Sequence, residues 1–118
     1  MIKSHKDLEV YKTSMDFVVL IYRLTQEFPK EEEFGLSSQM RRASVSIVSN
    51  ISEGAARNNT KQFIQFLYYS LGSASELETQ IELAKRIGFI NDESKDIKTL
   101  HYIISMLSGL IKSLKQKL

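Results

Sequence analysis

The chain has 118 residues, which is enough for one domain with a single hydrophobic core. Hydrophobic residues make up 42% and charged residues 25%, as in ordinary globular proteins, and the net charge is only +2. The chain contains no cysteine, which excludes disulfides, thiol catalysis and thiolate metal sites. We expect a cytoplasmic protein without a membrane segment, because the sequence shows no signal-peptide core and no apolar run of about 20 residues.

The first expected helix covers residues 7–27 and ends before Pro29, because a residue that precedes proline avoids helical geometry. Ser4 and Asp7 have the spacing of a capping box at its start. Apolar residues at spacings of three and four predict its core-facing seam: Leu8, Tyr11, Met15, Val18 and Tyr22, widened by Val19, Ile21 and Leu24. The acidic segment at 29–35 is typical of a solvated loop rather than of a metal or partner site.

The second expected helix, residues 37–57 with Ser37 as N-cap, is the central one, because residues 43–52 carry no charge. At 100° per residue its apolar face consists of Leu36, Met40, Ala43, Ile47, Ile51 and Gly54. A polar stripe runs through Arg42, Ser46, Asn50, Glu53 and Arg57, and small or apolar residues lie between the two. A strand at 44–47 is rejected, since the sequence offers no second strand to satisfy its backbone groups.

The third expected helix, residues 60–87, follows an N-cap turn at 58–60 and stops at Gly88. Its seam is Phe63, Phe66, Leu67, Ser70, Ala74, Leu77, Ile81 and Ala84, and a slim middle lets a neighbour approach closely. The fourth helix, residues 92–117, is capped by Asn91 or Asp92, and its seam is Ile97, Leu100, Ile104, Leu107, Ile111, Leu114 and Leu118. These elements predict one all-α domain over residues 1–118, an antiparallel up-down-up-down four-helix bundle.

No catalytic constellation or cofactor motif occurs, and neither His5 nor His101 has a positioned second group nearby in the sequence. We therefore expect no enzyme activity, no metal and no cofactor. Cations that can pair with phosphates are the candidates for nucleic-acid binding: Arg41, Arg42, Arg57, Lys61, Lys85, Arg86, Lys112 and Lys115. For Arg41 and Arg42 the alternative is ion pairing with Glu53, Glu76 or Glu78. Tyr68 and Tyr69 can stack on bases, or simply pack.

The small face of the second helix predicts a subunit interface. Its candidate residues are Val45, Val48, Ser49, Asn50, Ser52, Glu53 and Ala56. Asn50 and Glu53 need polar partners if another chain covers them, so we interpret them as interface residues rather than as acid–base catalysts.

Several motifs stand at characteristic spacings: DLEVY at 7–11, GLSSQMRRA at 35–43, Ser46-Ile47, NISEG at 50–54 with Arg57, Phe63, Phe66-Leu67, Gly72-Ser73, and ELETQ at 76–80 with Ala84 and Gly88. In these motifs the chain resembles the bacterial four-helix-bundle proteins encoded in intervening sequences of 23S ribosomal RNA genes. That family is related to the accessory variability protein of diversity-generating retroelements. The resemblance implies a homo-oligomer, a pentameric ring, with no known catalytic activity.

In the retroelement relatives the ring resembles a basic platform that binds nucleic acid and a reverse transcriptase. Five copies of this chain would carry a summed charge of about +10, which favours contact with RNA or DNA. We therefore expect a homo-oligomeric scaffold or adaptor that binds nucleic acid through the basic surfaces of the assembled ring. The alternative is a protein–protein interaction module, for example a partner of a reverse transcriptase, with no nucleic-acid contact.

Overall fold

The computed structural model describes residues 8–91 and 96–118. In this part of the chain there are four α-helices and no strand: α1 (Glu9–Gln26), α2 (Leu36–Ala55), α3 (Thr60–Ile87) and α4 (Asp96–Lys115), with a 3-10 turn η2 (Lys30–Glu32) before α2. The predicted all-α fold is confirmed, and the bounds of α3 coincide with those expected. The proposed capping box at Ser4 and Asp7 and the proposed cap at Asp92 lie outside the described residues.

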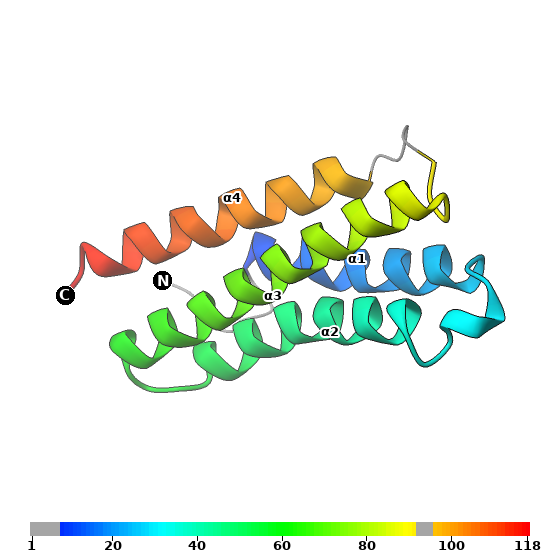
Figure 1. Ribbon diagram of the computed structural model, residues 1–118. Coiled ribbons are helices and arrows are strands. Elements are labelled where there is room, and N and C mark those ends of the chain that lie inside the picture. The colour runs from blue at the N-terminus through cyan, green and yellow to red at the C-terminus, as the bar shows by residue number, and fades with distance from the viewer. Residues whose placement is uncertain (1–7, 92–95) are drawn as a thin grey trace.

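The four helices pack as a closed bundle in which each helix contacts its two neighbours. The pairs packed side by side are α1–α2, α2–α3, α3–α4 and α1–α4, and among the described residues no diagonal pair brings Cα atoms within 8 Å. Successive helices run in opposite directions along a body of 46 × 24 × 19 Å (Figure 1). One end, the η2 end, carries the α1–α2 loop and the last residues of α3. The opposite end, the turn end, carries the α2–α3 turn and the last turn of α4.

All four helices contribute to the core. Its largest fully buried side chains are Phe17, Ile21, Met40, Ile47, Ile51, Leu67, Leu77, Ile81, Leu100, Ile103 and Leu107. The predicted apolar face of α2 is buried over its whole length, as is most of the α3 seam. The predicted α4 seam is wrong at two positions: it omits the buried Ile103 and includes Leu118, which is 64% exposed beyond the end of the helix. A strict 3-4 repeat drifts around a 3.6-residue helix, so a seam read that way misplaces residues near its edges.

The predicted seam of α1 is also wrong in part, because α1 turns a different face to the core. Its buried residues are Val10, Ser14, Phe17, Ile21 and Thr25, whereas Met15, Val19 and Tyr22 are exposed. Two of the core-facing residues, Ser14 and Thr25, carry hydroxyl groups, and the predicted apolar seam did not include them. The Thr25 hydroxyl donates to the Ile21 carbonyl over 2.8 Å, so its burial leaves it satisfied. The predicted apolar stripe, which includes Met15 and Tyr22, remains on the surface beside α2.

Helices α2 and α3 approach each other most closely through small residues. The Ser70 hydroxyl donates to the Ile47 carbonyl over 2.7 Å, and the Ser46 and Ser73 hydroxyls share a hydrogen bond of 2.8 Å. A Cβ atom added at Gly54 would lie 2.6 Å from the Cβ of Phe66. The expectation that the slim middle of α3 admits a close neighbour is consistent with this packing.

The helix ends follow from local chemistry. The Asn59 carboxamide oxygen accepts from the Gln62 amide over 2.9 Å and caps α3, within the turn at 58–60 where a cap was predicted. Gly88 ends α3 in the left-handed conformation at φ 99°, as predicted. Ser37 is not the N-cap of α2: the cap position is Gly35, and Ser37 is buried in the first turn. The Glu32 carboxylate supplies the missing acceptor, because it receives the Leu36 amide over 3.0 Å.

Candidate interaction surfaces

A shallow apolar surface lies along the outer junction of α1 and α2. We call it the open face and define it as Tyr11, Met15 and Tyr22 of α1 with Val45, Val48, Ser49, Ser52 and Ala56 of α2. Its middle is a hollow of about 350 Å³ lined by Tyr11, Met15, Val48, Ser49, Ser52, Glu53 and Ala56. Exposed fractions of 45% for Met15, 40% for Tyr22 and 38% for Val45 show that the apolar side chains around it face outward. Val48 is buried but stands apart from the core cluster, so it belongs to this surface.

The structure brings most of the predicted interface residues of α2 to the open face. Val48, Ser49, Ser52, Glu53 and Ala56 line the hollow, and Val45 is exposed on the same helix. Asn50 is the exception, because its amide donates to the Ser46 carbonyl over 2.8 Å and to the Ser46 hydroxyl over 3.1 Å, on the α3 side of α2. The sequence reasoning missed the α1 half of this surface, although the apolar stripe of α1 was the signal that marks it.

Arg41 ties α1 to α2 at one end of the open face. Its Nε donates to the Thr25 hydroxyl over 2.8 Å, its Nη2 to the Tyr22 carbonyl over 3.4 Å, and its guanidinium lies 4.7 Å from the centroid of the Tyr22 ring. The predicted structural alternative was an ion pair with a glutamate. The partners are instead a hydroxyl, a carbonyl and an aromatic face, so that alternative is wrong about the partner.

Arg42 points to the opposite flank of α2. It lines a polar hollow of about 270 Å³ together with Gln39, Ala43, Ser46 and Glu76. The predicted ion pair with Glu76 does not form, and Arg42 makes no hydrogen bond or ion pair with any described residue. Its guanidinium is therefore available to a ligand or to a second chain.

The remaining predicted cations divide between the two ends of the bundle. At the η2 end, Arg86 pairs with Glu82 over 3.0 Å, and Lys85 lines a hollow of about 400 Å³ with Glu78, Glu82 and His101 among others. At the turn end, Arg57 pairs with Glu53 over 3.3 Å and lies 4.9 Å from the centroid of the Phe66 ring, while Lys61 and Lys112 are exposed. A single chain therefore does not gather the eight predicted cations into one basic surface.

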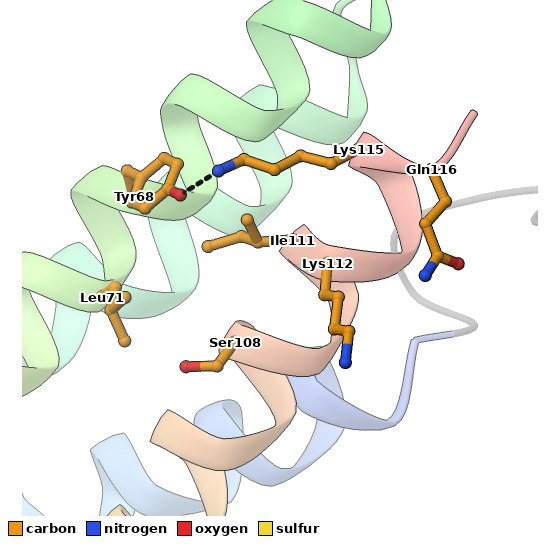
Figure 2. A pocket seen from close by; sticks show the side chains of 7 residues that line it. All are labelled: Tyr68, Leu71, Ser108, Ile111, Lys112, Lys115 and Gln116. Carbon is orange, nitrogen blue, oxygen red and sulfur yellow. Dashed lines mark hydrogen bonds between the residues drawn. The ribbon is translucent and has the colours of Figure 1, made fainter. Parts of the chain in front are cut away.

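A second groove lies between α3 and α4 near the turn end (Figure 2). It has a volume of about 410 Å³ and is lined by Tyr68 and Leu71 of α3 and by Ser108, Ile111, Lys112, Lys115 and Gln116 of the α4 segment. Lys115 reaches across it: its ammonium donates to the Tyr68 hydroxyl over 2.6 Å and lies 5.1 Å from the ring centroid. The sequence singled out Tyr68, Lys112 and Lys115 separately, but nothing in it showed that two helices would bring them to one groove.

The described residues hold no group of three or more acidic or histidine side chains placed to bind a metal. His101 forms a 2.6 Å hydrogen bond with Glu78 across α3 and α4, and His5 lies outside the described residues. Within residues 8–91 and 96–118, no helix combines the length and apolar character that crossing a bilayer requires.

Comparisons with known proteins bear on fold and family. The profile of the family described as 23S rRNA-intervening sequence protein matches residues 6–113. Among solved structures, a protein of unknown function from the S23 ribosomal protein family of Bacteroides thetaiotaomicron is similar at a TM-score of 0.80 and 29% identity. That alignment covers 87% of this chain and 95% of the other, so the whole bundle is shared. No curated protein matches the sequence significantly.

Proposed function

Because this chain belongs to the 23S rRNA-intervening sequence protein family, whose fold it shares, we propose that it is a non-enzymatic scaffold that assembles with further copies of itself through the open face. The observation that carries the proposal is the apolar hollow of about 350 Å³ between α1 and α2, together with the exposed Met15, Tyr22 and Val45 of the open face. Apolar side chains grouped on one surface are typical of an interaction site, whereas single exposed ones are ordinary.

The chemistry of the open face suits another protein surface. Small residues at Ser49, Ser52 and Ala56 leave room for side chains of a partner, while Met15 offers a flexible apolar group that adapts to its neighbour. Glu53 and Arg41 lie at its rim, which matches the usual arrangement of an apolar centre with polar edges. A stable interface needs about 800 Å² from each partner, so the contact must extend beyond the hollow along both helices. A pentameric ring is the assembly that we propose.

The test introduces a charge into the open face. We expect Val45→Glu and Ala56→Glu to dissociate the open-face assembly, so that the mass measured by light scattering or sedimentation falls, while circular dichroism keeps its helical signal, because a buried unpaired carboxylate is costly at an interface. Ser105→Glu is the matched control, since it adds the same charge at an exposed position of α4. A wild-type chain that is monomeric at micromolar concentration overturns the proposal.

A second candidate function is nucleic-acid contact at the turn end of the assembled scaffold. The observation that favours it is that Lys61 and Lys112 are exposed there without an acidic partner among the described residues, near Arg57 and Lys115. Repetition of these cations around an assembly would give a surface for a phosphate backbone.

Nucleic-acid contact is tested by titrating labelled single-stranded and duplex RNA and DNA at several salt concentrations. We expect affinity to fall steeply as salt rises, because phosphate neutralisation releases counterions. Lys61→Glu should weaken binding, while Lys98→Glu, an exposed control at the other end of the bundle, should affect it less. If no nucleic acid binds at low salt, the scaffold works through protein partners alone, such as a reverse transcriptase.

A further inference from the structure

The η2 end carries an aromatic side chain that the bundle does not use. Phe34 is 91% exposed, the largest fraction among the large hydrophobic residues described. It sits on an ordered turn, because the Glu32 amide donates to the Pro29 carbonyl over 2.9 Å and the Gly35 amide to the Glu32 carbonyl over 3.0 Å. The Glu32 side chain is occupied in capping α2, whereas Glu31 and Glu33, close to Phe34 in sequence, are exposed. We call Glu31, Glu33 and Phe34 the acidic tip.

The α3–α4 groove has the complementary composition. Leu71 and Ile111 form its apolar floor, since Ile111 belongs to the core and Leu71 packs against it. Two lysines, Lys112 and Lys115, stand at its rim (Figure 2). The Tyr68 hydroxyl uses one of the three N–H donors of the Lys115 ammonium, which leaves donors for a carboxylate. A ligand that fits this groove therefore combines an apolar group with negative charge.

The acidic tip and the groove cannot meet within one chain, because they lie in opposite halves of a bundle 46 Å long (Figure 1). We propose that the acidic tip of one copy docks into the α3–α4 groove of a second copy. The Phe34 ring then covers Leu71 and Ile111, and the Glu31 and Glu33 carboxylates lie against the two lysines. This contact goes beyond the proposed scaffold function, since it uses neither helix surface of the open face.

The geometry of this contact is head to tail. Each chain has one tip and one groove, so a bound pair still offers a free tip and a free groove, and association either propagates or closes into a ring. Opposite charges on tip and groove orient the encounter and disfavour tip-to-tip and groove-to-groove pairing. Lysines alone would also suit a phosphate backbone, but the tip supplies both an apolar ring and two carboxylates, which match the floor as well as the rim.

The contact is measured first with a fluorescent reporter. The chain has no tryptophan, so Phe34→Trp places a single indole on the tip. In a Val45→Glu background, which removes the open-face contact, we expect the emission to shift to shorter wavelength as chain concentration rises, because the indole enters an apolar groove. Tyr69→Trp is the control, since Tyr69 is exposed on α3 but does not line the groove. An emission maximum that stays constant up to millimolar concentration overturns the proposal.

A charge exchange then tests which surfaces meet. In the same Val45→Glu background, Glu31→Lys with Glu33→Lys reverses the tip and leaves the capping Glu32 intact, while Lys112→Glu with Lys115→Glu reverses the groove. We expect each doubly reversed chain alone to lose self-association, and an equimolar mixture of the two to regain it in sedimentation. Phe34→Ala should weaken the association roughly tenfold or more, as the loss of a buried aromatic group requires.

The outcomes separate this proposal from the scaffold function. If Val45→Glu leaves the oligomer intact, the open-face proposal fails, and the charge exchange still reports on the tip. If the mixture does not associate, the tip–groove contact is wrong whatever the open face does. If reversal of the groove abolishes RNA binding but leaves self-association unchanged, the groove is a nucleic-acid site and the proposed docking is overturned.

Discussion

The two flanks of α2 have similar composition but different roles. On the α3 flank, Ser46 shares a hydrogen bond of 2.8 Å with Ser73, and a Cβ at Gly54 would meet Phe66 at 2.6 Å. On the α1 flank, Ser49, Ser52 and Ala56 border a hollow of about 350 Å³. Small residues let two backbones come together on one flank and leave an unfilled surface on the other.

The difference arises from the opposing helix. The middle of α3 is also built from small residues, so both helices can approach until hydroxyl groups of one reach the backbone of the other, as Ser70 reaches the Ile47 carbonyl over 2.7 Å. α1 instead presents the larger side chains of Tyr11, Met15 and Tyr22 beside α2, and a hollow remains where Tyr11 and Met15 meet the small residues of α2. A run of small residues in one helix therefore predicts close packing only when its partner is also slim.

The largest expected effect comes from disrupting the close packing of α2 against α3. Gly54→Ala should destabilise the fold by about 1–3 kcal/mol, because the new methyl group meets the Cβ of Phe66, which cannot move without its backbone. Gly72→Ala is the matched control: nothing lies within 4 Å of the position of its Cβ, so higher helix propensity should stabilise the chain by up to about 1 kcal/mol. Urea unfolding followed by circular dichroism measures both. Equal effects of the two substitutions would contradict the close approach at Gly54.

A smaller loss of stability is expected when the hydrogen bond between Ser70 of α3 and Ile47 of α2 is removed. Ser70→Ala removes the buried donor to the Ile47 carbonyl, and a net hydrogen bond of this kind contributes about 1 kcal/mol. Ser75→Ala should change the free energy of unfolding by less than about 0.5 kcal/mol, because Ser75 is exposed on the same helix. The same urea unfolding experiment measures both variants. If Ser70→Ala lowers the free energy of unfolding no more than Ser75→Ala does, the hydrogen bond contributes nothing to stability.

The neighbouring residues Arg41 and Arg42 lie on opposite flanks of α2, so substituting each in turn compares the two flanks directly. Arg41→Ala should cost about 1 kcal/mol, since it removes the hydrogen bond to Thr25 and the contact with the Tyr22 ring that tie α1 to α2. Arg42→Ala should cost less than about 0.5 kcal/mol, because Arg42 has no hydrogen-bond or ion-pair partner among the described residues. If Arg41→Ala leaves thermal stability unchanged, its role as a tie between helices is wrong.

The fold was largely predictable because helix signals are local. The asparagine cap at Asn59, the stop at Gly88 and the apolar face of α2 each follow from a few neighbouring residues. The orientation of α1 was not, because its pattern holds two apolar stripes and only packing selects one. Ser14 and Thr25 face the core, where hydropathy alone would not place them. Ser14 is buried although its hydroxyl has no hydrogen-bond partner among the described residues.

The candidate surfaces were predictable in part for a related reason. The small face of α2 lies on a single helix, so all of its outward residues but Asn50 could be identified without the fold. Surfaces that two helices share depend on which residues the packing brings together, as Tyr68 and Lys115 show across 47 positions of the chain. The same holds for the partners of Arg41, because Thr25 and Tyr22 lie on another helix and carry no charge that marks them.

The smallest expected effect on stability is that of Val45→Thr, which tests whether the α1 flank of α2 is covered in the assembly. Val45→Thr keeps the branched shape and nearly the same helix propensity, so in a dilute, monomeric sample it should change the free energy of unfolding by less than about 0.5 kcal/mol. At concentrations where copies assemble, binding stabilises the folded chain, and a polar group at the interface weakens that stabilisation. The effect of Val45→Thr on the melting temperature should therefore grow with chain concentration, while that of Ser75→Ala stays constant. Differential scanning calorimetry across a hundredfold concentration range measures this dependence, and an effect of Val45→Thr that does not vary with concentration means that the open face stays uncovered in the assembly.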